Sequence, residues 1–199
     1  MRRYLLPAVA LAVLLGGAYY YGWIGPTRVP IEVSYAYDVS DPAQVFGDAS
    51  FVVVGRVEKD LGPAEDDSTA FQVRVLRELK GDVPDVIEVI QDGFRRGRRT
   101  WELADFPLFE VGKTYVMALT IPAPDWNQDR LVVLVGPLDR PTTQVSGPDD
   151  PAVAAYLTAI GNARYPDGFT SEFVDAQAEM VRAWLEAHPG YSSPGPASP

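Results

Sequence analysis

The chain has 199 residues, of which 47% are apolar and 22% are charged, with one histidine and no cysteine. Without cysteine it can form no disulfide scaffold, no thiolate zinc site and no cysteine nucleophile. The 17 basic and 27 acidic residues give a net charge of −10. A surface of this sign repels phosphate backbones, so we expect no nucleic-acid partner.

The amino-terminal residues 1–25 have the pattern of a membrane segment. Arg2 and Arg3 precede an uncharged stretch from Tyr4 to Ile24, which as a helix is long enough to cross the roughly 30 Å hydrocarbon core of a bilayer. Tyrosines 19–21 and Trp23 then suit the headgroup region, where aromatic side chains gather. The sequence therefore predicts a single transmembrane helix that contacts lipid through Tyr4 to Ile24.

A secretory signal is the alternative for the same segment. Gly16 and Ala18 are small residues at the two positions that define a cleavage site, and cleavage near Ala18 would give a secreted protein. In both cases the rest of the chain is exported. For the retained anchor, the two amino-terminal arginines place the amino terminus in the cytoplasm by the positive-inside rule, so the domain is extracytoplasmic.

Residues 26–145 are expected to form one mainly β domain. Pro26 to Pro30 is interpreted as a linker, followed by an alternating strand from Ile31 to Ala36. Asp41-Pro42 is typical of a helix start and predicts a short helix near Ala43 to Asp48. Five apolar, β-branched runs then predict strands, at Phe51 to Glu58, Phe71 to Leu76, Val86 to Ile90, Tyr115 to Ile121 and Leu131 to Val135. Strands at such short spacing favour a small barrel or sandwich.

Residues 146–190 are expected to be a helical extension packed on the barrel. Asp150-Pro151 predicts a helix start, with an end near Gly161. A second, amphipathic helix is predicted from Thr170 or Ser171 to about His188. Residues 191–199, with three prolines and three serines, are expected to be a disordered tail.

A family resemblance rests on four segments. They are Asp48-Ala49-Ser50-Phe51-Val52-Val53-Val54-Gly55-Arg56-Val57, then Phe71 to Val75, then Leu79-Lys80-Gly81, then Phe109-Glu110-Val111-Gly112-Lys113-Thr114-Tyr115-Val116. This series resembles exported bacterial OB-fold domains similar to the netrin and tissue-inhibitor-of-metalloproteinase (NTR/TIMP-like) group, over about Ala43 to Pro137. The resemblance implies a five-stranded OB-like barrel. The group's inhibitory amino-terminal cysteine and its disulfides are missing here, so that activity does not carry over and the barrel must rest on core packing.

The search for catalytic residues finds no set that we can assign. His188 lies at the end of the second amphipathic helix, where a structural or solvated role is expected. The acidic pairs Asp66-Asp67 and Asp149-Asp150 lack a calcium-loop spacing and are interpreted as a solvated loop and a helix cap. We therefore predict no catalytic residue, no metal and no cofactor. A carboxylate pair in which Glu102, Asp105 or Glu110 approaches any other acid stays open as a hydrolase hypothesis.

An arginine cluster is the main candidate ligand-binding site. Phe94 and Trp101 flank four arginines within a polar loop from Gln91 to Thr100, and the candidate residues are Arg95, Arg96, Arg98, Arg99 and Trp101. Planar guanidinium groups clamp carboxylates or phosphates and stack on aromatic rings. Two other interpretations stay open: a solvated loop that pairs with the domain's acids, and a contact with anionic lipid headgroups.

These observations favour a membrane-anchored, extracytoplasmic recognition module that binds an envelope protein or an anionic ligand and has no enzymatic activity. One alternative is a structural or regulatory accessory subunit of a membrane protein, which would use the anchor or the second amphipathic helix as its contact. The other is the carboxylate-dependent hydrolase.

Overall fold

The computed structural model describes residues 27–31, 41–64, 67–103, 106–122, 130–134 and 144–193. The expected anchor or signal segment at residues 1–25 lies outside the described residues, as do residues 194–199 of the expected tail. Among the residues that are described, no helix combines the length and the hydropathy needed to cross a membrane.

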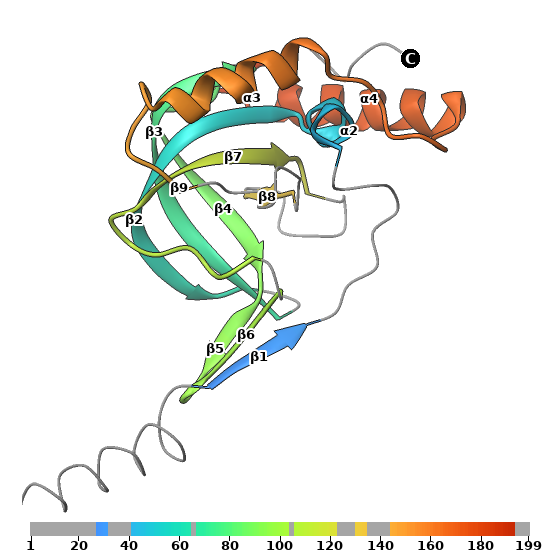
Figure 1. Ribbon diagram of the computed structural model, residues 1–199. Coiled ribbons are helices and arrows are strands. Elements are labelled where there is room, and N and C mark those ends of the chain that lie inside the picture. Colours follow the sequence, from blue (N-terminus) through green and yellow to red (C-terminus); the bar gives the residue numbers. More distant parts are fainter. Residues whose placement is uncertain are drawn as a thin grey trace, which may run out of the picture.

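Five strands close into a barrel (Figure 1). They are β2 (Phe51–Pro63), β3 (Ser68–Lys80), β4 (Val86–Asp92), β7 (Thr114–Thr120) and β8 (Leu131–Val133). Around the ring the order is β2-β3-β4-β8-β7, and β7 pairs again with β2. The β4–β8 pairing is parallel and the other four are antiparallel. Of the small barrel and the sandwich that the five apolar runs left open, the structure shows the barrel, and a short strand β9 (Gln144–Val145) extends it beside β7.

Strand β2 has to curl to take part in this ring. Its pairing with β3 shifts register at four places, one of them between Val54 and Gly55. A Cβ atom at Gly55 would lie 2.5 Å from Cγ1 of Val73, so glycine permits the close approach of the two strands at this bulge.

The core has two parts, on the two faces of β2. Phe51, Val53 and Val57 belong to the cluster inside the barrel. Val52 and Val54 belong to a second cluster, against the helices α2 (Pro42–Asp48) and α3 (Pro151–Gly161). Burial on both faces explains why β2 begins as a continuous apolar run instead of an alternating one.

Each of the three helices in the described ranges begins at a capping side chain. Asp41 accepts a hydrogen bond from the Ala43 amide at 2.9 Å, and Asp150 accepts one from the Ala152 amide at 2.9 Å. Thr170 caps α4 (Ser171–Ala187) by accepting from the Phe173 amide at 3.2 Å. The structure thus confirms these helix starts. They can be predicted from the sequence because an N-cap side chain accepts hydrogen bonds from first-turn amides that lie only a few positions away.

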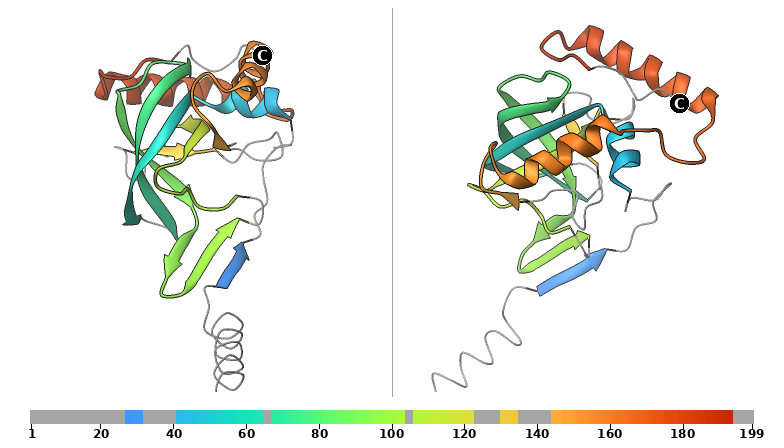
Figure 2. Two further views of the ribbon diagram at one scale, coloured as in Figure 1. Left: turned by 60° about the vertical axis from the view of Figure 1, so that its left-hand side comes forward. Right: turned by 45° about the horizontal axis from the view of Figure 1, so that its top comes forward.

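A separate three-stranded sheet differs from the sequence expectation. Part of the expected linker forms β1 (Thr27–Ile31), and part of the expected polar loop forms β5 (Phe94–Arg96) and β6 (Arg99–Leu103), in the order β1-β6-β5. The remainder of the strand predicted from Ile31 to Ala36 lies outside the described residues. In all views β1, β5 and β6 lie at one end of the barrel and the three helices lie at the other (Figure 2).

The described chain also continues into the expected disordered tail. Tyr191 packs its ring 4.9 Å from that of Trp184 and 5.7 Å from that of Phe51. Ser192 forms a β-bridge with Asp82. Tyr191, which follows α4 closely, is therefore part of the packed domain, although the proline- and serine-rich sequence around it predicted a disordered tail.

Lys80 connects the barrel to α2. Its Nζ atom donates hydrogen bonds to the carbonyl oxygens of Phe46, at 2.7 Å, and Ala49, at 2.5 Å. Burial lowers the pKa of Lys80 to about 8, and the charge of nearby Asp48 opposes this shift. The ammonium group thus caps the carboxyl end of α2 at a desolvated position.

We expect the free energy of unfolding to rise between pH 8 and pH 10. In this window the unfolded chain keeps a Lys80 proton that the folded protein has released, so stability increases with pH. Burial raises the pKa of Tyr165 to about 12, so above pH 10 the folded protein keeps a proton that the unfolded chain loses, and stability falls. Urea denaturation of the full chain in neutral detergent should give a rise of about 1–3 kcal/mol. The rise should vanish in Lys80→Met, and a flat profile in the parent chain would contradict the argument.

Candidate functional site

The arginine cluster lies on a β-hairpin, not on an irregular loop. Strands β5 and β6 pair antiparallel and are joined by Gly97 and Arg98; we call these three parts the arginine hairpin. Gly97 has a φ angle of +64° and Arg98 does not have a positive φ, as in the two-residue II′ turn that places glycine first. The Gly97-Arg98 pair was the sequence signal for this hairpin turn. The flanking strands were missed because arginine-rich segments lack the apolar alternation by which strands are recognised.

Gly93 sets the direction in which the hairpin leaves the barrel. It separates β4 from β5 with a φ of +111°, and a Cβ atom there would lie 2.7 Å from the Trp101 carbonyl oxygen. Its own carbonyl oxygen accepts a hydrogen bond of 2.7 Å from the buried Thr69 hydroxyl. The chain can turn out of the barrel here because glycine tolerates both the dihedral and the close contact.

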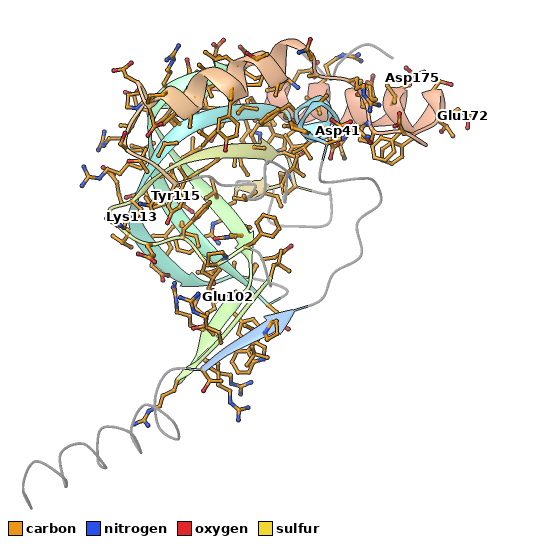
Figure 3. All side chains as sticks on the ribbon, in the orientation of Figure 1. Asp41, Glu102, Lys113, Tyr115, Glu172 and Asp175 are labelled. Atoms are coloured by element: carbon orange, nitrogen blue, oxygen red, sulfur yellow. The ribbon has the colours of Figure 1, made fainter. Side chains whose placement is uncertain are left out.

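Two buried polar side chains fasten the base of the hairpin to the barrel. The Gln91 amide accepts from the Phe109 backbone N–H at 2.9 Å and donates to the Pro107 carbonyl at 3.1 Å. Glu102 accepts from the Leu108 N–H at 3.2 Å and lies 3.3 Å from the guanidinium of Arg28 on β1. These contacts give the hairpin a fixed base, and Figure 3 shows Glu102 where the hairpin joins the barrel.

The five predicted site residues are brought onto this hairpin, but they differ in their partners. Arg95 is held at the base, because its guanidinium pairs with Asp60 of β2 at 2.5 Å and donates to the Phe109 carbonyl at 3.5 Å. Arg96 and Arg99 are exposed and stand directly opposite each other across the two strands. Within the part of the chain that the structure describes, neither of them forms an ion pair.

Arg98 occupies the second position of the turn and is also exposed. Its carbonyl oxygen accepts a hydrogen bond of 3.0 Å from the Thr27 amide, at the first residue of β1. Arg28, on the next residue of β1, adds a fifth guanidinium beside the four that the sequence analysis selected. That contribution was missed because the pairing of β1 with β6 joins segments about seventy residues apart along the chain.

An aromatic pair lies directly below the charged tip. The rings of Phe94 and Trp101 are stacked, with centroids 4.7 Å apart and an interplanar angle of 8°. Both side chains are half-buried. This non-polar cross-strand pair lies between the arginines and the barrel. It stabilises the hairpin there, as cross-strand aromatic pairs do.

A small pocket of about 200 Å³ lies between the hairpin base and the β2–β3 end of the barrel. Asp60, Gly62, Pro63, Thr69 and Arg95 line it. Because Arg95 is already paired with Asp60 there, the pocket presents less positive charge than the tip of the hairpin does.

A larger groove of about 550 Å³ runs along α4, at the opposite end of the molecule. Apolar side chains dominate its lining, among them Ile121, Met180 and Trp184. His188 borders the groove, stacks on Trp184 at a centroid distance of 3.9 Å, and has Nδ1 2.7 Å from the Trp184 carbonyl oxygen. This is the structural helix-end environment that the sequence predicted for His188.

The acidic residues considered for catalysis or metal binding are spread over the fold. Asp150 is the cap of α3, as predicted, and hydrogen bonds from Ser146 and Ala152 hold its pKa below the usual range. Glu102 is engaged at the hairpin base, while Asp66 and Asp105 lie outside the described residues. The described ranges contain no group of three or more His, Asp or Glu side chains placed to hold a metal ion.

Comparison of the sequence with models of known protein families gives no match. Comparison with curated proteins gives none either.

Proposed function

We propose that the protein is a membrane-anchored, extracytoplasmic recognition module without catalytic activity, and that its arginine hairpin binds an anionic group. The placement of Arg96 opposite Arg99 is the observation that carries the proposal. Like charges directly opposite each other on a hairpin destabilise it. The barrel pair Arg56–Arg74 is relieved by the Arg74–Glu58 ion pair, whereas Arg96 and Arg99 form no ion pair within the described residues. Guanidinium groups held in this way form a fork for a carboxylate or a phosphate.

The strand order of the barrel supports the OB-like part of the proposal. Numbered along the chain, the five barrel strands follow each other in the order 1-2-3-5-4, with 4 closing on 1 and a parallel pair between 3 and 5. OB barrels commonly serve as platforms for binding, with ligands held by one face and its adjoining loops. This agrees with the resemblance to the NTR/TIMP-like group, which we retain as part of the proposal.

The membrane location rests on the sequence. The uncharged stretch from residue 4 to residue 24 supplies the anchor, and Arg2 and Arg3 favour a cytoplasmic amino terminus. The non-catalytic part rests on the contacts of the titratable side chains: His188 is stacked and hydrogen-bonded at a helix end, and Glu102 is bonded to a backbone amide.

The test measures binding of a soluble polyanion, dextran sulfate, to the full chain in neutral detergent. Replacing Arg96, Arg98 and Arg99 together with serine should weaken binding by at least about tenfold, because the forked donors are lost. The matched control replaces Arg56, Arg77 and Arg182 with serine, which removes the same charge from exposed positions on the barrel and α4. The control should bind like the parent chain, and an equal loss in both variants would overturn the hairpin's role.

A second candidate function is favoured by the apolar groove along α4. It is the role of an accessory subunit that contacts a membrane protein through this helix. Co-purification of such a protein from native membranes with both arginine variants would support this role and would separate it from recognition by the hairpin.

A further inference from the structure

We infer that the arginine hairpin docks on the anionic lipid headgroups of the membrane that holds residues 4–24. The inference deepens the proposed function and rests on it, because it names the source of the anionic group. Its starting point is that the tip of the hairpin and the point where the chain enters the domain are in the same place.

The register of β1 fixes this location. Thr27 is paired with Arg99, in a parallel arrangement, and its amide donates to the Arg98 carbonyl oxygen at 3.0 Å. Ile24, the last residue of the apolar stretch, precedes Thr27 by three residues. Three steps of about 3.8 Å along the chain allow a separation of at most about 11 Å. The tip therefore lies within reach of the membrane surface at which the anchor ends.

The tip of the hairpin has the charge that an anionic surface attracts. Acidic residues lie at the base of the hairpin: Asp60 and Glu102 are engaged by Arg95 and Arg28, and Asp67 and Asp92 lie where β4 leads into the hairpin. The guanidinium groups of Arg96, Arg98 and Arg99 lie beyond them, at the exposed tip. Each basic residue near an anionic leaflet strengthens association by about fivefold, so three together contribute about a hundredfold.

The stacked Phe94 and Trp101 rings support the charged tip from the barrel side. They lie one step behind the arginines, so the rings stay on the solvent side of the headgroups when the guanidinium groups meet the phosphates. Cross-strand aromatic pairs stabilise hairpins. The stack therefore holds the arginines in place for docking.

The opposite end of the domain carries exposed acidic residues. On α4 these are Glu172, Asp175, Glu179 and Glu186, and Figure 3 shows Glu172 and Asp175 far from the hairpin. The protein has a net charge of −10, with the basic tip of the hairpin beside the anchor and the acidic α4 away from it. An anionic membrane would hold such a charge distribution with the hairpin inward and α4 outward.

The test uses the full chain reconstituted into vesicles of phosphatidylcholine, with or without phosphatidylglycerol. The chain has no cysteine, so Gly97→Cys provides a unique site for an environment-sensitive fluorophore. A Cβ atom at Gly97 meets nothing within 4 Å, so the substitution meets no steric obstacle beyond the strain of a positive φ. Gly161→Cys, at the end of α3, is the matched label at the opposite end and is likewise unobstructed.

We expect the emission of the label at position 97 to shift to the blue when phosphatidylglycerol is present, and to return at high salt. In neutral vesicles the label should emit as it does in water. The label at position 161 should not respond. The Arg96, Arg98 and Arg99 to serine variant should reduce the ratio of docked to undocked hairpin by about a hundredfold, and the Arg56, Arg77 and Arg182 control should not.

The outcomes separate the inference from the function on which it rests. Flotation of the chain with neutral vesicles reports the anchor, so failure to float overturns the anchored function and the docking together. Flotation without a lipid-dependent shift at position 97 overturns the docking alone. If dextran sulfate is still bound in that case, the anionic partner is an acidic protein surface or a soluble anionic ligand, and not lipid.

Discussion

Replacing Phe51 with alanine is expected to lower the free energy of unfolding by about 4 kcal/mol. Phe51 is fully buried at the start of β2, with its ring 6.3 Å from that of Trp184 and 5.7 Å from that of Tyr191. It joins the interior of the barrel to α4, so its loss leaves a cavity bordered by large rings that cannot all move inward. Urea denaturation in neutral detergent measures the change.

Phe173→Ala is the matched control for this prediction. Phe173 lies on α4 with half of its surface exposed, although its ring contacts Phe169 with centroids 4.5 Å apart. The same atoms are removed, but much less apolar surface is lost from the core, and we expect a change below about 1 kcal/mol. Equal effects of the two substitutions would contradict the assignment of Phe51 as the link between barrel and helix.

The second large effect is expected at Gly47, within α2. A Cβ atom there would lie 1.9 Å from the Arg164 carbonyl oxygen and 2.4 Å from the carbon of the same carbonyl. This backbone cannot simply retreat, because the Arg164 amide donates to the Ala43 carbonyl at 2.9 Å and the Arg164 side chain pairs with Asp41 at 2.6 Å. Gly47→Ala should therefore destabilise the protein by about 3 kcal/mol, as over-packing does.

Gly161→Ala supplies the opposite expectation from the same chemical change. Gly161 is the last residue of α3, and no atom lies within 4 Å of a Cβ placed there. Alanine is the better helix former by up to about 1 kcal/mol, so this variant should be unchanged or slightly more stable. Thermal melts of the two variants side by side provide the comparison, and a stabilised Gly47→Ala would show that α2 does not pack against the chain after α3 as described.

The parts of the fold that depend on neighbouring residues were predictable from the sequence. Asp41, Asp150 and Thr170 cap helices through amides two or three positions away, and the β-branched run of β2 is apolar because both faces are covered. The pairing of β1 with β6 was not predictable. Pro30 within β1 lacks a backbone donor, and what makes this segment a strand is a partner some seventy residues further along the chain.

The candidate site divides in the same way. Residue types and their closeness in sequence identified the four arginines and Trp101, and the glycine at position 97 permits the turn that unites them. Which arginine is neutralised was not predictable, because Asp60 reaches Arg95 from a strand 35 positions earlier. The distinction matters for function, since it moves the available positive charge from the middle of the cluster to its tip.

The short strand β8, whose parallel pairing with β4 completes the barrel, also determines where the ring of strands opens most easily. Strand β8 has three residues and pairs through two positions with β4 and two with β7, whereas β2 and β3 pair along most of their thirteen residues. The Arg130–Glu88 ion pair beside this seam, at 2.8 Å, adds at most about 1 kcal/mol. Lateral breathing of the barrel therefore begins at β8, so the amides of Leu131 and Val133 exchange with solvent through openings that leave the β2–β3 hairpin intact.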